Sequence, residues 1–120
     1  MRILIVDDDA RFAGVLAQVL KAHGYLDVDV DDSGEAAMSL LRDKPCDLLV
    51  TDLRMGGMDG LTLMGEARRR SSDTRVILMT AFADVETART ALKRGAMDYL
   101  VKPFDNRDLL QLVEQAASAQ

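Results

Sequence analysis

The sequence predicts an α/β domain in which helices cover both faces of a parallel sheet. Short apolar runs alternate five times with stretches whose apolar residues recur at helical spacing. Strands that alternate with helices of about 10 to 15 residues are typical of parallel sheets with right-handed crossovers. The second strand has the alternating pattern of a sheet edge. These observations favour the flavodoxin-like (βα)5 doubly wound fold, with strand order 2-1-3-4-5.

Size and composition indicate one globular domain. The 120 residues are enough for a single core, and 48% apolar with 29% charged residues is ordinary for such a domain. The net charge of −5 argues against direct nucleic-acid binding. The single cysteine, Cys46, suits a reducing compartment, and we interpret it as a small buried apolar side chain. Residues 3–6 are too short an apolar run for a signal peptide or a membrane span, so we expect a cytoplasmic protein without a membrane partner.

The chain opens with a strand and a helix. Ile3 to Val6 is a continuous β-rich run, which predicts a buried strand. The helix that follows ends at Gly24, and its apolar face is predicted to carry Phe12, Val15, Leu16, Val19 and Leu20. His23 lies in the last turn, where the helix dipole favours a cation, so we interpret it as a surface residue and not a catalytic one.

The second unit contains the predicted edge strand. Leu26, Val28 and Val30 alternate with aspartates, which indicates a half-exposed strand. Ser33 is a good N-cap for the next helix. Pro45 ends that helix, because the residue before a proline disfavours the helical region.

The third strand ends in a charged residue. Asp52 closes the apolar run of residues 48–50, and the loop after it has three glycines between residues 56 and 60. Aspartate also begins turns and caps helices, so Asp52 alone leaves a structural and a ligand-binding interpretation open. In open parallel sheets, ligands bind outside the carboxyl ends of the strands. The other strand ends therefore decide between the two interpretations.

The fourth unit begins after a helix over residues 61–70. Residues 76–79 predict a buried strand that ends in Thr80. Asp84 is a candidate cap for the following helix, which Gly95 ends and whose apolar positions are Val85, Ala88 and Leu92.

The last unit is a short strand and a helix. Residues 98–101 predict the strand, which ends in Lys102-Pro103. Asp105 or Asn106 is expected to cap the last helix, whose inward face carries Leu109, Leu112, Val113 and Ala116. Residues 118–120 are expected to be a fraying tail or the start of a linker.

Four of the strand ends supply chemistry that fits together. Because parallel strands share one polarity, we expect one rim of the sheet to carry Asp7, Asp8, Asp52, Thr80 and Lys102. Crowded carboxylates repel one another unless a cation relieves them, and a ligand set of oxygens alone selects Mg²⁺ over zinc. A carboxylate beside that metal can attack phosphorus and form an aspartyl phosphate. Lys102 and the Thr80 hydroxyl would then contact the transferred oxygens.

Five motifs carry these residues in order and span essentially the whole chain: Ile5 to Asp9, Leu49 to Met55, Met58 to Gly60, Met79 to Ala81 and Tyr99 to Phe104. The set resembles the receiver domain of two-component response regulators. Residues 80–84 and 97–100 are most similar to the nitrogen-regulation (NtrC-like) type of transcriptional activator.

The resemblance implies a Mg²⁺-dependent phosphoacceptor. Asp52 would accept a phosphoryl group from the phosphohistidine of a sensor histidine kinase. Mg²⁺ would be held by Asp8, Asp52 and the backbone carbonyl of Arg54, with Asp7 acting largely through bound water. The phosphoryl group would be contacted by Thr80 and Lys102. The domain would be no enzyme, since it would catalyse only its own phosphorylation and dephosphorylation.

The resemblance also implies a switch. Thr80 would move toward the phosphate and Tyr99 would turn inward, which would remodel the face of residues 84–117 for an output domain, a partner or a homodimer. Simple core packing is the alternative interpretation of Tyr99. The Lys102-Pro103 bond is expected to be cis. Residues 1–120 would be one receiver domain, at the N-terminal end of a longer DNA-binding regulator of transcription.

Three positions raise questions about this function. The family most often has Met-Pro-Gly-Met-Asp-Gly after the acceptor, and Gly56 stands in place of that proline. We expect a looser loop and weaker Mg²⁺ binding than a Gly56→Pro variant would show. Arg54 and Phe82 would flank the path of an attacking water and set the phosphate lifetime; ordinary loop surface is their alternative interpretation.

Two other functions stay open at the level of sequence. A phosphatase of the haloacid-dehalogenase type also uses an aspartyl nucleophile, but Arg11 stands where its Thr or Val belongs, and the chain has no room for a cap domain. A degenerate receiver that binds partners without phosphate is the second, and Gly56 is the departure that keeps it open.

Overall fold

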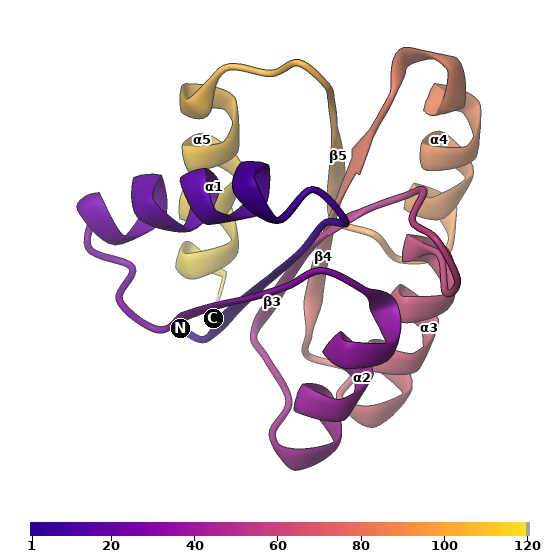
Figure 1. The fold of residues 1–120 in the computed structure, drawn as a ribbon, viewed down its shortest axis with the longest axis horizontal. Helices are drawn as coiled ribbons and strands as arrows, with labels where there is room; N and C mark the ends of the chain where they lie inside the picture. The colour runs from indigo at the N-terminus through magenta and orange to yellow at the C-terminus, as the bar shows by residue number, and fades with distance from the viewer. Residues whose placement is uncertain (120) are drawn as a thin grey trace.

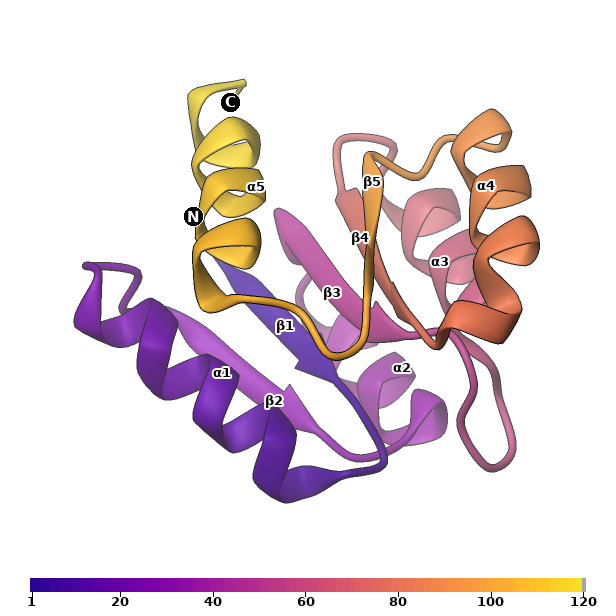
Figure 2. The same cartoon turned by 90° about the horizontal axis from the view of Figure 1, so that it is seen from above.

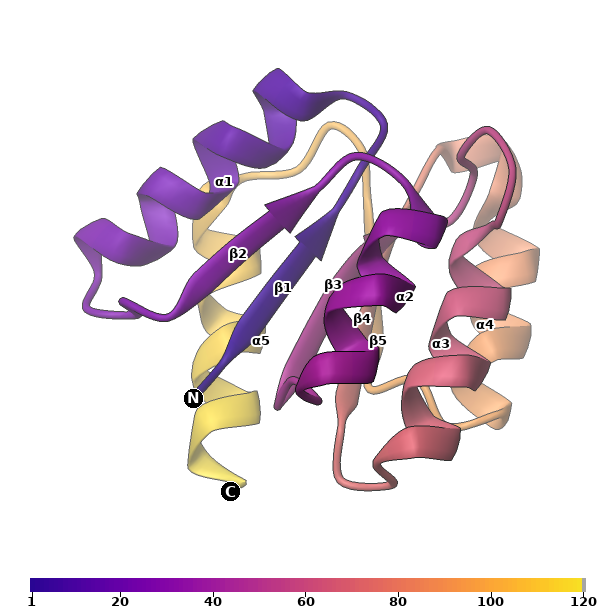
Figure 3. The ribbon, with the colours of Figure 1, turned by 60° about the horizontal axis from the view of Figure 1, so that its bottom comes forward.

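The computed structural model describes residues 1–119 as a parallel sheet between two layers of helices (Figure 1). Its five strands are β1 (Ile3–Val6), β2 (Val28–Asp31), β3 (Leu48–Asp52), β4 (Arg75–Thr80) and β5 (Asp98–Val101). Every neighbouring pair is parallel, and the order is β2-β1-β3-β4-β5. The predicted fold class and strand order are therefore confirmed, with β2 at the edge as Figure 3 shows.

The helices divide between the two faces of the sheet. They are α1 (Ala10–Ala22), α2 (Gly34–Asp43), α3 (Gly60–Arg70), α4 (Val85–Lys93) and α5 (Asn106–Ser118), with a short 3-10 helix, η1 (Phe82–Asp84), before α4. Helices α1 and α5 cover one face, and α2, α3 and α4 cover the other (Figure 2). Among the helices of residues 1–119, none is long and apolar enough to cross a membrane.

Strands β1, β3 and β4 each supply both halves of the core, because successive side chains of a strand point to opposite faces. The half beneath α1 and α5 takes Ile3, Ile5, Leu48, Val50 and Ile77 from the strands. The half beneath α2, α3 and α4 takes Leu4, Val6, Leu49, Val76 and Leu78. Cys46 lies in this second half, where burial raises the pKa of its thiol to about 12. Its interpretation as a small buried apolar side chain is confirmed.

Local capping fixes where the helices begin and end. Ser33 accepts a hydrogen bond from the Ala36 N–H and caps α2, and Asp105 accepts one from the Arg107 N–H and caps α5. Gly95 follows α4 with φ +110°, a left-handed conformation that favours glycine.

Three predicted core positions are wrong. Val15 is 54% exposed, because α1 packs on a face made of Ala13, Leu16, Ala17 and Leu20. The buried face of α1 is thus rotated away from Val15 toward the small alanines. The spacing of large apolar residues alone could not identify this face. Leu26 is 77% exposed and precedes β2, and Leu92 is exposed at the end of α4.

Two predictions about element ends also change. Asp84 occupies the N-cap position of α4, but its carboxylate accepts a hydrogen bond from Arg54 on another loop instead of from the helix. The predicted tail is shorter than expected, because Ser118 still belongs to α5 and Ala119 is its C-cap. Gln120 lies outside the described residues.

Candidate functional site

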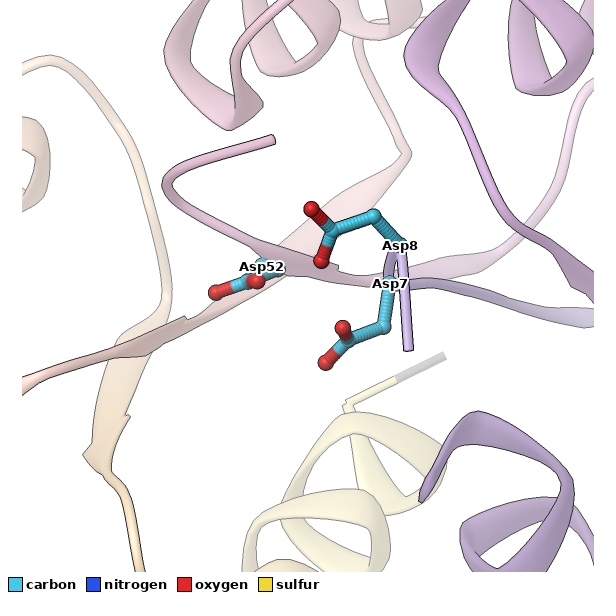
Figure 4. Close-up of side chains that lie close together, drawn as sticks. All are labelled: Asp7, Asp8 and Asp52. Atoms are coloured by element: carbon cyan, nitrogen blue, oxygen red, sulfur yellow. The ribbon is translucent and has the colours of Figure 1, made fainter. Parts of the chain in front are cut away.

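Three carboxylates meet at the carboxyl ends of β1 and β3. Val6 pairs with Thr51 in the sheet, so the residues that follow each of them emerge side by side. Figure 4 shows Asp7 and Asp8 leaving the end of β1, with Asp52 beside them. One oxygen from each of the three lies within 4.8 Å of the others. The topology thus gathers residues that lie 45 positions apart in the sequence, since 52 − 7 = 45.

Asp7 is the buried member of this group. Its backbone N–H donates to the Asp31 carbonyl, which extends the β1–β2 ladder by one residue and holds the side chain inside. One carboxylate oxygen accepts the Asp9 N–H at 2.9 Å, and the other lies 2.6 Å from the Lys102 ammonium. The Asp7 side chain is only 1% exposed, so its negative charge depends on that ammonium.

Lys102 lies within 4 Å of two of the three carboxylates, Asp7 and Asp52. Its Nζ lies 2.6 Å from Asp7 Oδ2 and 3.5 Å from Asp52 Oδ2. Its backbone N–H donates to the Thr80 carbonyl at 2.8 Å, and the Lys102–Pro103 peptide bond is cis. The ammonium also lies 4.7 Å from the centre of the Phe12 ring, a distance at which the ring face attracts a cation.

Asp52 is destabilised as an anion in this setting. Burial above all, and then the charge of Asp7, raise the pKa of the carboxyl from 3.8 to about 6, although Lys102 acts to lower it. Asp52 is therefore charged at neutral pH but held in an unfavourable environment. A cation or an electrophile that takes up this charge would be bound favourably.

The donor set fits a hard divalent cation. All three members are carboxylates, which suit Mg²⁺ better than zinc. One oxygen from each carboxylate lies within 4.8 Å of the others, so the three side chains could share one cation. Such a cation would offset their mutual repulsion.

Thr80 and Tyr99 lie on the neighbouring strands β4 and β5, Thr80 at the end of β4 and Tyr99 beside Leu78. Thr80 is fully buried at the end of β4, and its hydroxyl donates to the Ala81 carbonyl at 3.1 Å. Tyr99 is half-buried on β5 and packs against the core half beneath α2, α3 and α4. The Thr80 hydroxyl would have to leave Ala81 before it could meet a group bound at Asp52.

The loop between β3 and α3 (residues 53–59, the β3–α3 loop) follows Asp52 directly. Leu53 N–H donates to the Met79 carbonyl at 2.8 Å, and Gly60 N–H returns to the Leu53 carbonyl at 2.9 Å. A Cβ on Gly60 would lie 2.3 Å from the Asp52 carbonyl oxygen, so only glycine allows this close return. The loop is therefore pinned at both ends beside Asp52.

Two further side chains bind this loop, and sequence reasoning missed both contacts. Arg54 donates to Asp84 at 2.9 Å across to the segment before α4. Glu35, in the first turn of α2, accepts the Met58 N–H at 3.0 Å. No local pattern connects positions 35 and 58, so only the fold reveals that contact. Phe82, which was predicted to flank the site with Arg54, is 83% exposed on the β4–α4 loop.

A cavity lies away from these carboxylates. It measures about 550 Å³ and lies at the opposite end of the sheet, where its lining includes Asp47, Asp73, Arg68 and Arg75. Charges of both signs line it, and both arginines donate to backbone carbonyls. The carboxylates at the strand ends are the stronger candidate because their charges are crowded and unbalanced.

Comparisons with known proteins agree with this geometry. Residues 3–114 match the family described as "Response regulator receiver domain". The transcriptional regulatory protein ZraR of Salmonella typhimurium is 41% identical over 114 residues, which cover 95% of this chain and 26% of ZraR. The DNA-binding transcriptional regulator NtrC of the same organism is 40% identical over 116 residues, covering 97% of this chain and 24% of NtrC.

Solved structures give the same result. The receiver domain of NtrX from Brucella abortus matches with a TM-score of 0.91 and 28% identity over 98% of this chain and 99% of that one. The receiver domain of nitrogen regulatory protein C matches with a TM-score of 0.86 and 39% identity over 98% and 94%. This chain spans about a quarter of the length of the curated relatives that it matches.

Proposed function

Since the chain belongs to the response regulator receiver domain family, we propose that Asp52 is its phosphoacceptor and that a sensor histidine kinase is the donor. The position of Lys102 is the observation that supports this most directly. Its ammonium lies within 4 Å of both Asp7 and Asp52. It can therefore pair with the Asp7 carboxylate and also contact a negatively charged group bound to Asp52. A purely structural lysine would need no second acidic partner.

The proposed reaction uses groups already present at the strand ends. Above pH 6 the Asp52 carboxylate is ionised, and one of its oxygens attacks the phosphorus of the donor as the phosphorus–nitrogen bond to histidine breaks. Lys102 would balance the charge of the transferred oxygens, and the Thr80 hydroxyl would exchange the Ala81 carbonyl for one of them.

Mg²⁺ is the proposed cofactor. Its residues would be Asp8, Asp52 and the backbone carbonyl of Arg54, with Asp7 acting largely through bound water. When bound, Mg²⁺ neutralises part of the charge between the acceptor and the phosphoryl oxygens. The burial of Asp7 and its bond to Lys102 support that largely indirect role.

We further propose that phosphorylation is a switch that acts on residues 84–117. A movement of Thr80 at the end of β4 would free space into which the half-buried Tyr99 could turn, which would alter the surface of α4, β5 and α5. The similarity to the transcriptional regulators ZraR and NtrC supports a transcriptional output, through a domain that this chain would control as part of a longer regulator. A homodimer through the same face is a second route to that output.

The cytoplasm is the proposed location. The free thiol of Cys46 suits a reducing compartment, and a sensor kinase's phosphohistidine would be met there. Catalysis by the domain would be limited to its own phosphorylation and dephosphorylation.

The test is to incubate the protein with Mg²⁺ and acetyl phosphate and to measure its mass. We expect the mass gain of one phosphoryl group, and its loss in Asp52→Ala. Asp73→Ala is the matched control, because Asp73 is an exposed aspartate at the opposite end of the sheet. Labelling that survives Asp52→Ala would overturn the assignment of the acceptor. Wild-type protein that gains no mass would indicate a degenerate receiver, and steady hydrolysis without an adduct would indicate a phosphatase.

A further inference from the structure

One side chain outside the strand ends holds the β3–α3 loop in place. Glu35 belongs to the first turn of α2, and its Oε2 accepts the Met58 N–H at 3.0 Å. We propose that Glu35 is a positioning residue: it tethers the β3–α3 loop so that Arg54 presents its backbone carbonyl to the metal beside Asp52. This inference rests on the proposed function, because it assumes that the loop contributes to a Mg²⁺ site.

The tether lies beside the glycine pair of the loop, Gly56 and Gly57. Gly56 and Gly57 are adjacent, and glycine loses more conformational freedom on ordering than any other residue. Gly57 has φ +81°, and a Cβ there would lie 2.6 Å from Glu35 Oε2. Glycine at 57 therefore satisfies both the backbone conformation and the approach of the carboxylate.

Close packing of α2 against the loop fixes the direction from which Glu35 arrives. A Cβ on the buried Gly34 would lie 2.8 Å from the Cβ of Met58 and 3.0 Å from its carbonyl oxygen. The start of α2 therefore lies directly against Met58. The following residue, Glu35, needs only its own side-chain length to reach the Met58 N–H.

The consequence for the site follows from the position of Arg54 in this loop. The loop ends are pinned at Leu53 and Gly60, and Glu35 adds a third fixed point between them. Without it, residues 55–58 would sample more conformations, and a metal that needs the Arg54 carbonyl would have to order them on binding. Loss of the tether should therefore weaken Mg²⁺ binding without changing any carboxylate ligand.

Two substitutions separate reach from charge. Glu35 also lies at the positive end of the α2 dipole, where any acidic residue stabilises the helix. Glu35→Asp keeps that charge but is one methylene too short for Met58. Glu35→Gln loses the charge but keeps the length and an oxygen that can accept the N–H. The tether predicts that Glu35→Gln resembles the wild type and that Glu35→Asp resembles Glu35→Ala.

The first measurement is made on metal-free protein. Solvent exchange of the Met58 amide proton, followed by NMR, should accelerate about fivefold in Glu35→Ala and Glu35→Asp, the size expected for the loss of one hydrogen bond at an exposed site. Titration calorimetry with Mg²⁺ should show a Kd about threefold higher in the same two variants. Glu114→Ala, which removes an exposed acidic charge from α5, is the control and should change neither value.

A proline at position 56 supplies an independent restraint. Gly56 has a negative φ, and a Cβ there would meet no described atom within 4 Å, so proline should fit. Gly56→Pro should restore most of the lost Mg²⁺ affinity in Glu35→Ala and should change the wild type much less. Gly56→Ala is a milder substitute if the proline variant fails to fold.

Three results would overturn the tether: Met58 exchange unchanged in Glu35→Ala, Glu35→Asp indistinguishable from the wild type, or Gly56→Pro equally effective in both backgrounds. Failure of the proposed function gives a different pattern. Wild-type protein would then bind no Mg²⁺ and gain no phosphoryl group, while Met58 exchange would still report whether Glu35 holds the loop.

Discussion

Polar side chains at the two ends of the sheet have different kinds of partner. At the amino-terminal end, buried or half-buried donors meet backbone carbonyls: Thr74 Oγ1 donates to Cys46 at 2.6 Å, and Arg75 donates to Ala119 at 3.1 Å. At the carboxyl-terminal end, Asp7 and Asp52 depend on a single ammonium, Lys102. The carboxyl-terminal end therefore retains unbalanced negative charge.

This difference indicates what each end contributes. The hydrogen bonds from Thr74 and Arg75 to backbone carbonyls join segments that are distant in the sequence, which stabilises the fold. Crowded carboxylates oppose folding, and a bound cation or phosphoryl group would relieve them. We therefore expect substitutions at the two ends to separate stability from phosphorylation.

Lys102→Met should have the largest effect. Asp7 would keep a fully buried charge without a counter-ion, and breaking a buried pair in this way lowers the free energy of unfolding by about 3 kcal/mol. Phosphorylation by acetyl phosphate should fall by about 100-fold or more, because no cation would meet the transferred oxygens. Urea unfolding and mass measurement check the two effects. The added change Asp7→Asn should restore part of the stability; if it did not, the charge of Asp7 would not be the cause.

Asp52→Asn should change stability in the opposite direction. The folded-state pKa of Asp52, about 6, lies above its ordinary value of 3.8, so the folded protein binds this proton more tightly than the unfolded chain. Stability is therefore lost as pH rises from about 4 to about 6, and the cost of ionisation is then constant. Removing the charge should stabilise metal-free protein by about 3 kcal/mol at pH 7 and by almost nothing at pH 3.5. Thermal unfolding at both pH values measures this; an equal gain at both would contradict it.

Sequence alone could predict the strand ends, because parallel polarity carries every C-terminal residue to one rim. Asp7, Asp52 and Lys102 were identified in this way, without knowledge of any contact. The contacts of Glu35 with Met58 and of Arg54 with Asp84 could not be, since they join segments 23 and 30 residues apart with no periodic signal. The prediction that Val15 is buried was wrong for a related reason. Ala13 and Ala17 belong to the buried face of α1, and an alanine in the sequence is a weak indication of burial.

Thr74→Val tests the amino-terminal end of the sheet. The substitution keeps the shape of a buried side chain but removes the hydroxyl that donates to the Cys46 carbonyl. We expect a loss of about 1 to 1.5 kcal/mol in the free energy of unfolding, with the rate of phosphorylation unchanged. Thr74→Ser retains the hydroxyl and should recover most of the loss. A slower phosphorylation rate in folded Thr74→Val protein would mean that the two ends are coupled.

The smallest effects on stability are expected for two arginines, Arg54 and Arg75, which lie at opposite ends of the sheet. Comparing them distinguishes the two ends by their effect on the phosphate lifetime. Arg54 pairs with Asp84 at one end and Arg75 with the Ala119 carbonyl at the other, and both contacts are exposed. Exposed pairs of this kind contribute about 0.5 kcal/mol or less, so Arg54→Ala and Arg75→Ala should unfold almost as the wild type does. Of these two arginines, only Arg54 lies in the β3–α3 loop. The decay rate of phosphorylated protein should therefore change in Arg54→Ala, and in Phe82→Ala, but not in Arg75→Ala. Equal decay in all three would show that these loop residues do not control the phosphate lifetime.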